Sequence, residues 1–332
     1  MTGREQLCAR FGQQKEETNL TKIYLTQDGV TDIISEPTKD CWICMTNPSE
    51  EELEAVQSLY NIDPDDLSAA LDEEETSRID VEDNYTLILI DIPTVEVRND
   101  KNRYVTIPLG IILLQDSIIT VCLEDTPLLN LFTGKRASQF STHMKSRFIF
   151  QILFANAKLY LRYLRSINKQ SESLEKSLHD STENSVLIDM MELGKSLLYF
   201  TTSLKATDNV LDKLTKTPTI KRYPEDEELL EDVIVENHQA LEMSEIYSGI
   251  LNGMMDAYAS IISNNMNVVQ KFIAVATVVL SIPNIVFGAY GMNLALEGMP
   301  LARSKYAFFL IIIISVILSY ITYLYFQKKR MY

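Results

Sequence analysis

The 332-residue sequence has few of the side chains from which most enzyme and metal sites are built, with only 3 histidines and 4 cysteines. His143, His179 and His238 are scattered over helical stretches, and no spacing between them suits a metal site. The sequence also has no nucleophile–base set and no glycine-rich phosphate loop. We therefore expect that the chain is not an enzyme.

The few cysteines also argue against a disulfide framework. Cys41 and Cys44 have the C-x-x-C spacing of a redox or metal pair, but there is no second pair. Residues 41–45 are typical of a strand, on which positions three apart point to opposite faces. In a cytosolic setting we expect this pair to be buried structural thiols, and Cys8 and Cys122 to be free thiols as well.

Positive charge is in deficit, with 30 Lys and Arg against 46 Asp and Glu and a net charge of −16. This balance argues against nucleic acid as a partner and against broad adhesion to anionic lipid. It is compatible with binding or concentrating cations. The first 20 residues lack an apolar stretch, so we expect no cleavable signal peptide and a cytosolic N-terminal part.

Long hydrophobic runs are absent until the last part of the chain, where residues 272–290 and 306–326 form two. Each run approaches the roughly 20 residues that cross a bilayer as a helix. About a dozen residues separate them, which is enough for a re-entry loop only. The sequence therefore predicts a multi-pass protein of the lipid bilayer with both termini on one side.

Basic residues beside the two runs indicate which side that is. Lys271 precedes the first run and residues 328–330 follow the second, whereas Arg303 and Lys305 lie in the connecting loop. By the positive-inside rule this balance favours cytoplasmic termini in an inner or plasma membrane.

The region before the membrane is predicted to be an α+β domain followed by long α-helices. Short runs rich in Ile, Leu, Val and Tyr predict strands at residues 22–25, 30–34, 41–45, 85–92, 105–114 and 117–123. Apolar residues at helical spacing predict two long antiparallel helices up to residue 214. From Pro224 a third helix opens with acidic residues and continues into the membrane.

The sequence thus divides into six segments. We expect a cytosolic α/β domain at 1–126, long antiparallel helices at 127–222, and a stalk helix that becomes the first transmembrane helix at 223–293. An extracytoplasmic loop at 294–305, a second transmembrane helix at 306–327 and a basic cytoplasmic tail at 328–332 complete the prediction.

One face of the third predicted helix has no large apolar side chain. Alternate steps of four and three residues keep to one helix face, and here they meet only small or polar residues: Gly249, Gly253, Asp256, Ser260, Ser263, Asn267, Gln270, Ala274, Thr277, Ser281, Asn284 and Gly288. In lipid such a polar line is costly unless it faces protein or water. Close packing of small residues between helices would explain the serines and alanine, but not Asn284, Gln270 or Asp256. We interpret this polar line as the lining of a pore.

The first apolar run ends on Tyr290-Gly291-Met292-Asn293. Gly291 is typical of a helix stop, and Asn293 places a neutral amide at the membrane surface. A simple helix cap is one interpretation. Alternatively, oligomerisation would arrange these amides and backbone carbonyls in a ring able to hold a hydrated cation.

Gly-Met-Asn at the end of the first of two C-terminal spans resembles the signature of the CorA family of divalent-cation transporters. Residues 42–53 and 72–85 also resemble the cytosolic domain of that family, and the likeness covers nearly the whole chain.

This resemblance implies a CorA-like funnel that assembles as a homopentamer and carries Mg²⁺. It implies an outer selectivity ring of Gly291, Met292 and Asn293, with Asn293 gripping the hydrated ion. Mg²⁺ dehydrates reluctantly, and neutral oxygens suit its bound water. The residues lining the pore would be Asp256, which forms an acidic ring, Ser263, Asn267, Gln270, Ala274, Thr277, Ser281, Asn284 and Gly288.

The sequence departs from the family at several positions. Gln270 and Ser281 are polar where the family often has large apolar gate residues, and the loop after Met299 is not acidic. Asp232 matches a regulatory Mg²⁺ ligand of some relatives, but its partner position is Ala69. Asp65, Asp66 or Asp72 would have to substitute for it.

Two alternatives to Mg²⁺ transport remain open. The same fold also suits transport of Zn²⁺, Co²⁺ or Ni²⁺, including proton-coupled transport as in the ZntB-like branch. The hard polar line, without sulfur or imidazole, favours Mg²⁺. A membrane-anchored signalling or scaffold protein is the third hypothesis, and it would have no need of a polar line.

Overall fold

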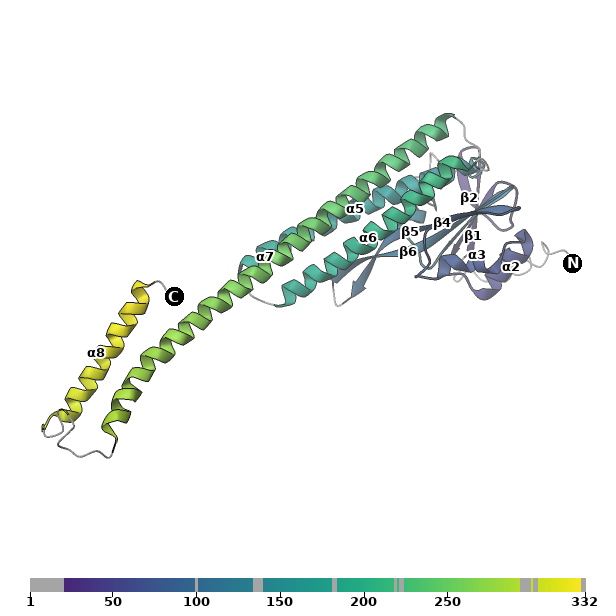
Figure 1. The fold of residues 1–332 in the computed structure, drawn as a ribbon. Coiled ribbons are helices and arrows are strands. Elements are labelled where there is room, and N and C mark those ends of the chain that lie inside the picture. Colours follow the sequence, from purple (N-terminus) through teal and green to yellow (C-terminus); the bar gives the residue numbers. More distant parts are fainter. Residues whose placement is uncertain are drawn as a thin grey trace. The chain divides into compact units, whose positions relative to one another are not determined.

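The structure, a computed structural model, describes residues 21–98, 101–133, 140–180, 184–217, 220, 224–292, 300 and 304–329 (Figure 1). Two compact units divide the chain, Met1–Gly253 and Met254–Tyr332. The boundary falls inside one helix, α7 (Pro224–Tyr290), which contributes to both units.

A seven-stranded sheet forms the centre of the first unit. Its strands are β1 (Thr21–Gln27), β2 (Val30–Ile34), β3 (Cys41–Thr46), β4 (Arg78–Val81), β5 (Tyr85–Arg98), β6 (Lys101–Leu114) and β7 (Ser117–Cys122). The strand order is β2-β1-β3-β7-β6-β5-β4, and β3 and β7 form the one parallel pair of this sheet. The predicted strands and the antiparallel β5–β6–β7 meander are present.

Both faces of the sheet are buried, which makes the unit three layers thick. On one face Ile43, Leu89 and Val121 pack against Val56 of α2 (Glu50–Tyr60) and Leu67 of α3 (Pro64–Ser68). A short 3₁₀ helix, η1 (Ala69–Leu71), packs on the same face.

Long helices cover the other face. They are α4 (Pro127–Thr133), α5 (Lys145–Asp180) and α6 (Asn184–Lys216), joined by the first turns of α7 (Figure 1). Trp42 and Phe148 stack edge to face in this core, with ring centroids 5.0 Å apart. Trp42 also donates a hydrogen bond to the Thr120 hydroxyl over 2.9 Å, which satisfies its indole N–H.

Local signals in the sequence explain several element ends. At the start of α2 the Glu52 backbone N–H donates to the Ser49 hydroxyl, and the Ser49 backbone N–H donates to the Glu52 carboxylate, which together form a capping box. The β1–β2 turn has left-handed backbone at Asp28 and Gly29, as the Asp-Gly pair predicts. Asn61 closes α2 in the left-handed conformation.

Two features of the sheet were not predicted. Strand β4 has only four residues, of which Ile79 alone is buried, so its apolar pattern is too short to recognise. The parallel pairing of β3 with β7 joins segments more than 70 residues apart, and no local pattern reports such a contact.

The second unit contains the C-terminal part of α7 and helix α8 (Ala307–Lys328). Both helices are long and apolar enough to cross a membrane. Helix α7 continues through Pro283, as the sequence predicts for a proline at membrane depth. The predicted segment boundaries remain predictions.

Candidate functional site

The polar line predicted from the sequence lies on one continuous helix, α7. Ala274, Thr277, Asn284 and Gly288 are exposed in the single chain and Ser281 is half-buried. The positions nearer the start of the helix are exposed as well: Gly249, Gly253, Asp256, Ser260, Ser263, Asn267 and Gln270.

A second line on α7 is less exposed and apolar. Val275 is only 6% exposed, and Val279, Ile282, Val286 and Tyr290 are half-buried. These residues recur at steps of four, three, four and four, so they share one helix face. At 100° per residue, this apolar line and the polar line from residue 274 to residue 288 point about 160° apart.

Helix α8 has a matching line of less exposed residues. Ser315 is 1% exposed, and Ala307, Ile311, Ser319 and Thr322 are half-buried. All other faces of α8 carry large exposed apolar side chains such as Phe308 and Ile317. These two lines are the least exposed faces of α7 and α8 in the second unit, and small residues are usual where helices pack inside membranes.

The small-residue line of α8 was missed in the sequence. Its signal was the spacing of Ser315, Ser319 and Thr322, which are the hydroxyl residues within an otherwise apolar run. On α7 the polar line lies on the side opposite to the less exposed apolar line, and it is exposed among the described residues of the hairpin.

The hydroxyl groups of the polar line have a defined orientation. Thr277 donates to the Ile273 carbonyl over 2.8 Å, and Ser281 donates to the Thr277 carbonyl over 2.7 Å. Ser260 likewise donates to the Asp256 carbonyl over 3.0 Å. Since each hydroxyl proton is used by the helix, the oxygen lone pairs remain free to accept from other donors.

The helix ends at Tyr290, directly before Gly291, as predicted. Gly291 lacks the left-handed backbone of the usual glycine stop, and its N–H still bonds to the Phe287 carbonyl over 2.9 Å. A Cβ at Gly291 would lie 3.3 Å from that same carbonyl oxygen, closer than ordinary contact. The Tyr290 hydroxyl donates to the Pro300 carbonyl over 3.1 Å and so ties the end of α7 to the chain that returns.

The predicted outer ring lies only in part within the described residues. Gly291 and Met292 are described, and Met292 is 55% exposed. Asn293, Glu297, Met299 and Arg303 lie outside the described residues.

The predicted regulatory residues belong to the first unit. Asp232 is exposed on α7, whereas Ala69 is buried under the sheet. The Asp66 carboxylate accepts a 2.6 Å hydrogen bond from Tyr85, and burial together with this bond raises the pKa of Tyr85 to about 12. Asp72 accepts from the Glu74 backbone N–H. Of the three substitutes considered, Asp65 alone is exposed with a carboxylate that makes no hydrogen bond or ion pair to another described residue.

The remaining candidate groups are dispersed. Cys41 and Cys44 are free thiols in the cores on opposite faces of the sheet, as predicted for a strand, and Cys122 is a third buried free thiol. Cys8 lies outside the described residues. His143 contacts Ser141 and His238 pairs with Asp208, and the described residues contain no group of three or more metal-binding side chains.

An α/β domain, a set of long helices and an apolar hairpin with one polar helix face define a membrane protein built around α7. The profile of the CorA-like Mg²⁺ transporter protein family matches residues 39–330. The chain therefore belongs to the CorA-like Mg²⁺ transporter family, which is a family of membrane transporters and not of enzymes. This membership confirms the resemblance carried by the Gly-Met-Asn signature.

Individual relatives agree along nearly the whole chain. The cobalt/magnesium transport protein CorA of Methanocaldococcus jannaschii is 27% identical over 325 residues, covering 93% of this chain and 99% of that protein. The protein of the same name from Thermotoga maritima is 21% identical over 297 residues, covering 87% and 82%. The complete structure of the M. jannaschii CorA magnesium transporter matches with a TM-score of 0.80 at 25% identity, over 93% of this chain and 98% of that one.

Proposed function

We propose that the chain transports Mg²⁺ across the membrane through a pore lined by the polar face of α7. The observation that carries this proposal is the position of the polar line, exposed on the side of α7 opposite to its less exposed apolar line. In lipid a line containing Thr277, Ser281 and Asn284 needs water or protein against it. A pore enclosed by several copies of α7, with α8 outside, supplies both.

The chemistry of the polar line suits a hydrated cation. The hydroxyl oxygens of Thr277 and Ser281 and the amide oxygens of Asn267, Gln270 and Asn284 accept hydrogen bonds. The water molecules around Mg²⁺ present protons outward, so neutral acceptors hold the ion without removing its shell. Asp256, nearer the start of the helix, would add a ring of negative charge that attracts cations.

The pore requires several copies of the chain, and we propose a homopentamer. Large apolar side chains are exposed on the single chain in the first unit, including Val235 and Ile246 of α7 and Leu198 of α6, at 64%, 58% and 63% exposure. Val235 and Ile246 are 11 residues apart, about three helical turns, and so lie on one face. Contacts between copies would bury this surface.

At the outer end we propose a ring of Gly291, Met292 and Asn293 that selects the ion. The end of α7 at Tyr290, the close approach of Gly291 to the Phe287 carbonyl and the Tyr290–Pro300 hydrogen bond support a rigid pore mouth. On this proposal both termini are cytoplasmic and residues 294–305 face outward.

Mg²⁺ would also regulate the pore through the first unit. Asp232 and Asp65 are exposed carboxylates that could bind one ion between two copies. Asp65 would take the place of the carboxylate that some relatives have at the position of Ala69. The gate is expected to differ from that of relatives with apolar residues at positions 270 and 281. Co²⁺ is the second proposed substrate, because the M. jannaschii relative is named a cobalt/magnesium transport protein.

The decisive experiment measures ion uptake into proteoliposomes that contain the purified full-length chain. Asn293→Ala should reduce Mg²⁺ uptake by at least tenfold, because it removes the neutral amide that grips the hydrated ion. Ile317→Ala is the matched control, since Ile317 is 51% exposed and belongs to α8, outside the polar line. Its uptake should equal that of the unaltered chain.

Unchanged uptake by Asn293→Ala protein that is correctly inserted would contradict the selectivity ring. Absence of uptake by the unaltered chain would favour the scaffold hypothesis. Competition by Co²⁺, Zn²⁺ and Ni²⁺ in the same assay, with and without a proton gradient, separates Mg²⁺ transport from the Zn²⁺ and proton-coupled alternatives.

A further inference from the structure

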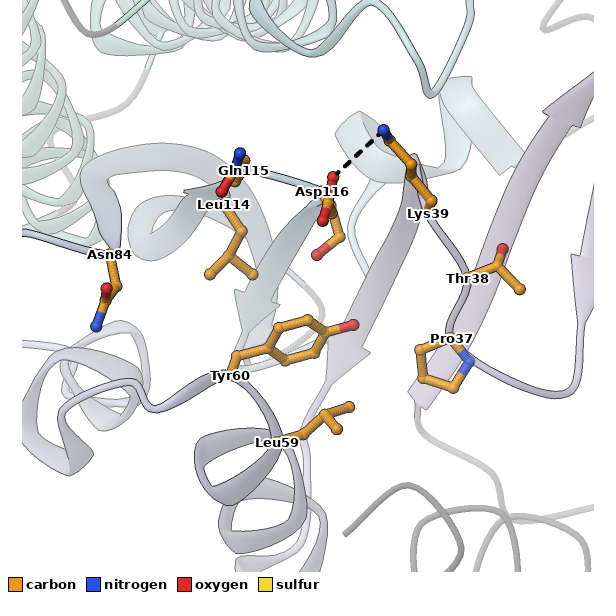
Figure 2. A pocket seen from close by; sticks show the side chains of 10 residues that line it. Pro37, Thr38, Lys39, Leu59, Tyr60, Asn84, Leu114, Gln115 and Asp116 are labelled. Atoms are coloured by element: carbon orange, nitrogen blue, oxygen red, sulfur yellow. Dashed lines mark ion pairs between the residues drawn. The ribbon is translucent and has the colours of Figure 1, made fainter. Parts of the chain in front are cut away.

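A cavity of about 310 Å³ lies within the first unit, at the edge of the sheet where β6 turns into β7. We name it the edge pocket. The C-terminal end of α2, the segment before β3 and the β6–β7 turn enclose it. Figure 2 shows Tyr60 lying across this pocket, with the ion pair of Lys39 and Asp116 along one side. None of these residues belongs to the proposed pore.

Ser117 is the feature of the edge pocket that points to a ligand. It is the first residue of β7, lines the pocket and is only 1% exposed. Its hydroxyl oxygen is buried and has no hydrogen-bond partner in the described part of the chain. Burying a hydroxyl without a partner costs stability, because its hydrogen bonds to water are lost. A polar atom of a bound molecule would form a hydrogen bond with the Ser117 hydroxyl in place of water.

The other lining groups define the shape and polarity of that molecule. Leu59 and Leu114 supply apolar walls and Tyr60 supplies an aromatic ring (Figure 2). Asn84 and Gln115 each carry an amide that both donates and accepts hydrogen bonds. Apolar walls, a flat ring and a few two-way hydrogen-bonding groups suit a planar heterocycle with polar edges.

Charge and size narrow the choice further. Lys39 Nζ lies 3.8 Å from Asp116 Oδ1, so the one cation lining the pocket is already balanced by the one anion. The chain carries a net charge of −16, which repels anionic molecules. The volume is at the lower end of the roughly 300–1,000 Å³ typical of ligand sites, which suits a single small molecule.

We propose that the edge pocket binds an uncharged nucleoside. Its base stacks on Tyr60, and one of its polar atoms forms the missing hydrogen bond with the Ser117 hydroxyl. Phosphorylated nucleotides bind more weakly, because the pocket offers no unpaired cation for the phosphate. This site is separate from ion transport and does not depend on it.

The test is isothermal titration of the full-length chain in detergent with adenosine, guanosine, cytidine and uridine, and with adenosine monophosphate for comparison. At least one nucleoside should bind saturably, with a dissociation constant on the order of 0.1 mM for a ligand of this size. Ser117→Ala should weaken this binding about tenfold, the loss expected for one buried hydrogen bond. Tyr60→Leu should weaken it at least as much.

Matched controls separate binding from folding. Thr207→Val removes another buried hydroxyl without a partner that does not line the pocket, and its nucleoside binding should be unchanged. Without ligand, Ser117→Ala should melt at the same temperature as the unaltered chain or higher, because the lost hydroxyl has no partner. Saturable binding that both pocket variants weaken supports the proposal. It is overturned if no nucleoside binds up to millimolar concentration, if Ser117→Ala binds as tightly as the unaltered chain, or if the monophosphate binds more tightly than adenosine.

Discussion

Single residues in the sheet domain set how closely its layers approach. A Cβ added to Gly110 in β6 would lie 2.8 Å from the Cβ of Ala70 in η1, which has no freedom to move aside. Glycine therefore permits the contact between the 3₁₀ helix and the sheet. Ala69 and Ala70 are both buried on this face of the sheet, although acidic residues precede and follow them in the sequence.

We predict that Gly110→Ala destabilises the protein by about 1–3 kcal/mol, the usual cost of overpacking a core. Gly194→Ala in helix α6 is the matched control, because a Cβ there meets the Leu251 side chain of α7 at an ordinary 3.6 Å. It should be neutral or stabilising by up to about 1 kcal/mol through helix propensity. Thermal unfolding of the two variants checks the prediction, and equal melting temperatures would contradict it.

The three described thiols should be chemically inert while the protein is folded. Burial raises the pKa of Cys122 to about 11, and it also raises the pKa of Cys41 and of Cys44. The reactive species is the thiolate, of which a thiol with such a pKa holds about one part in a thousand at pH 8.

In a Cys8→Ser variant, we therefore expect almost no labelling by a maleimide at pH 8 until denaturant is added. Labelling of the denatured chain provides the control for reagent activity. Rapid labelling of any of the three in the folded protein, followed by mass spectrometry, would disprove the expected burial.

Helix α7 carries an apolar line on one side and a polar line on the opposite side. We infer from the exposed fractions that the apolar line of α7 packs against the small-residue line of α8, which leaves the polar line of α7 on the other side. Ser315 sits at the centre of the small-residue line and is 1% exposed, whereas the adjacent Val316 is 59% exposed.

We predict that Ser315→Leu lowers the melting temperature of the protein in detergent, because the larger side chain separates two packed helices at a cost of about 1–3 kcal/mol. Val316→Leu, on the exposed side, should leave the melting temperature unchanged. If both variants melt alike, the two helices do not face each other through Ser315.

At the scale of the whole molecule, apolar residues of α6 and α7 in the first unit are exposed on the single chain, and contacts with other copies would bury them. Patches of this kind on a soluble surface usually mark protein interfaces. Placing a charge there should weaken assembly more than changing a charge that is already exposed.

Ile246→Glu should shift the full-length chain from the proposed pentamer towards smaller species in native mass spectrometry, because burying an unpaired carboxylate is costly. Glu175→Gln, at an exposed position of α5, should leave the assembly intact. Retention of the pentamer by Ile246→Glu would place the interface elsewhere.

Local sequence patterns determined much of the secondary structure of this protein. Short runs of Ile, Leu, Val and Tyr located the strands, an Asp-Gly pair located the β1–β2 turn, and length with hydropathy located the two apolar helices. The step of four and three along α7 was enough by itself to separate a polar helix face from the apolar ones. These features depend on neighbours within a few residues, where backbone geometry alone relates position to direction.

Contacts between distant segments were decided only by the tertiary structure. Pairing of β3 with β7, the approach of Gly110 to Ala70 and the edge pocket around Ser117 each join segments far apart in the chain. The small-residue line of α8 was recognised only from the exposed fractions of its residues in the folded chain. Such contacts depend on how whole layers pack, and the free energy of packing is a property of both partners together, which neither segment carries in its own residues.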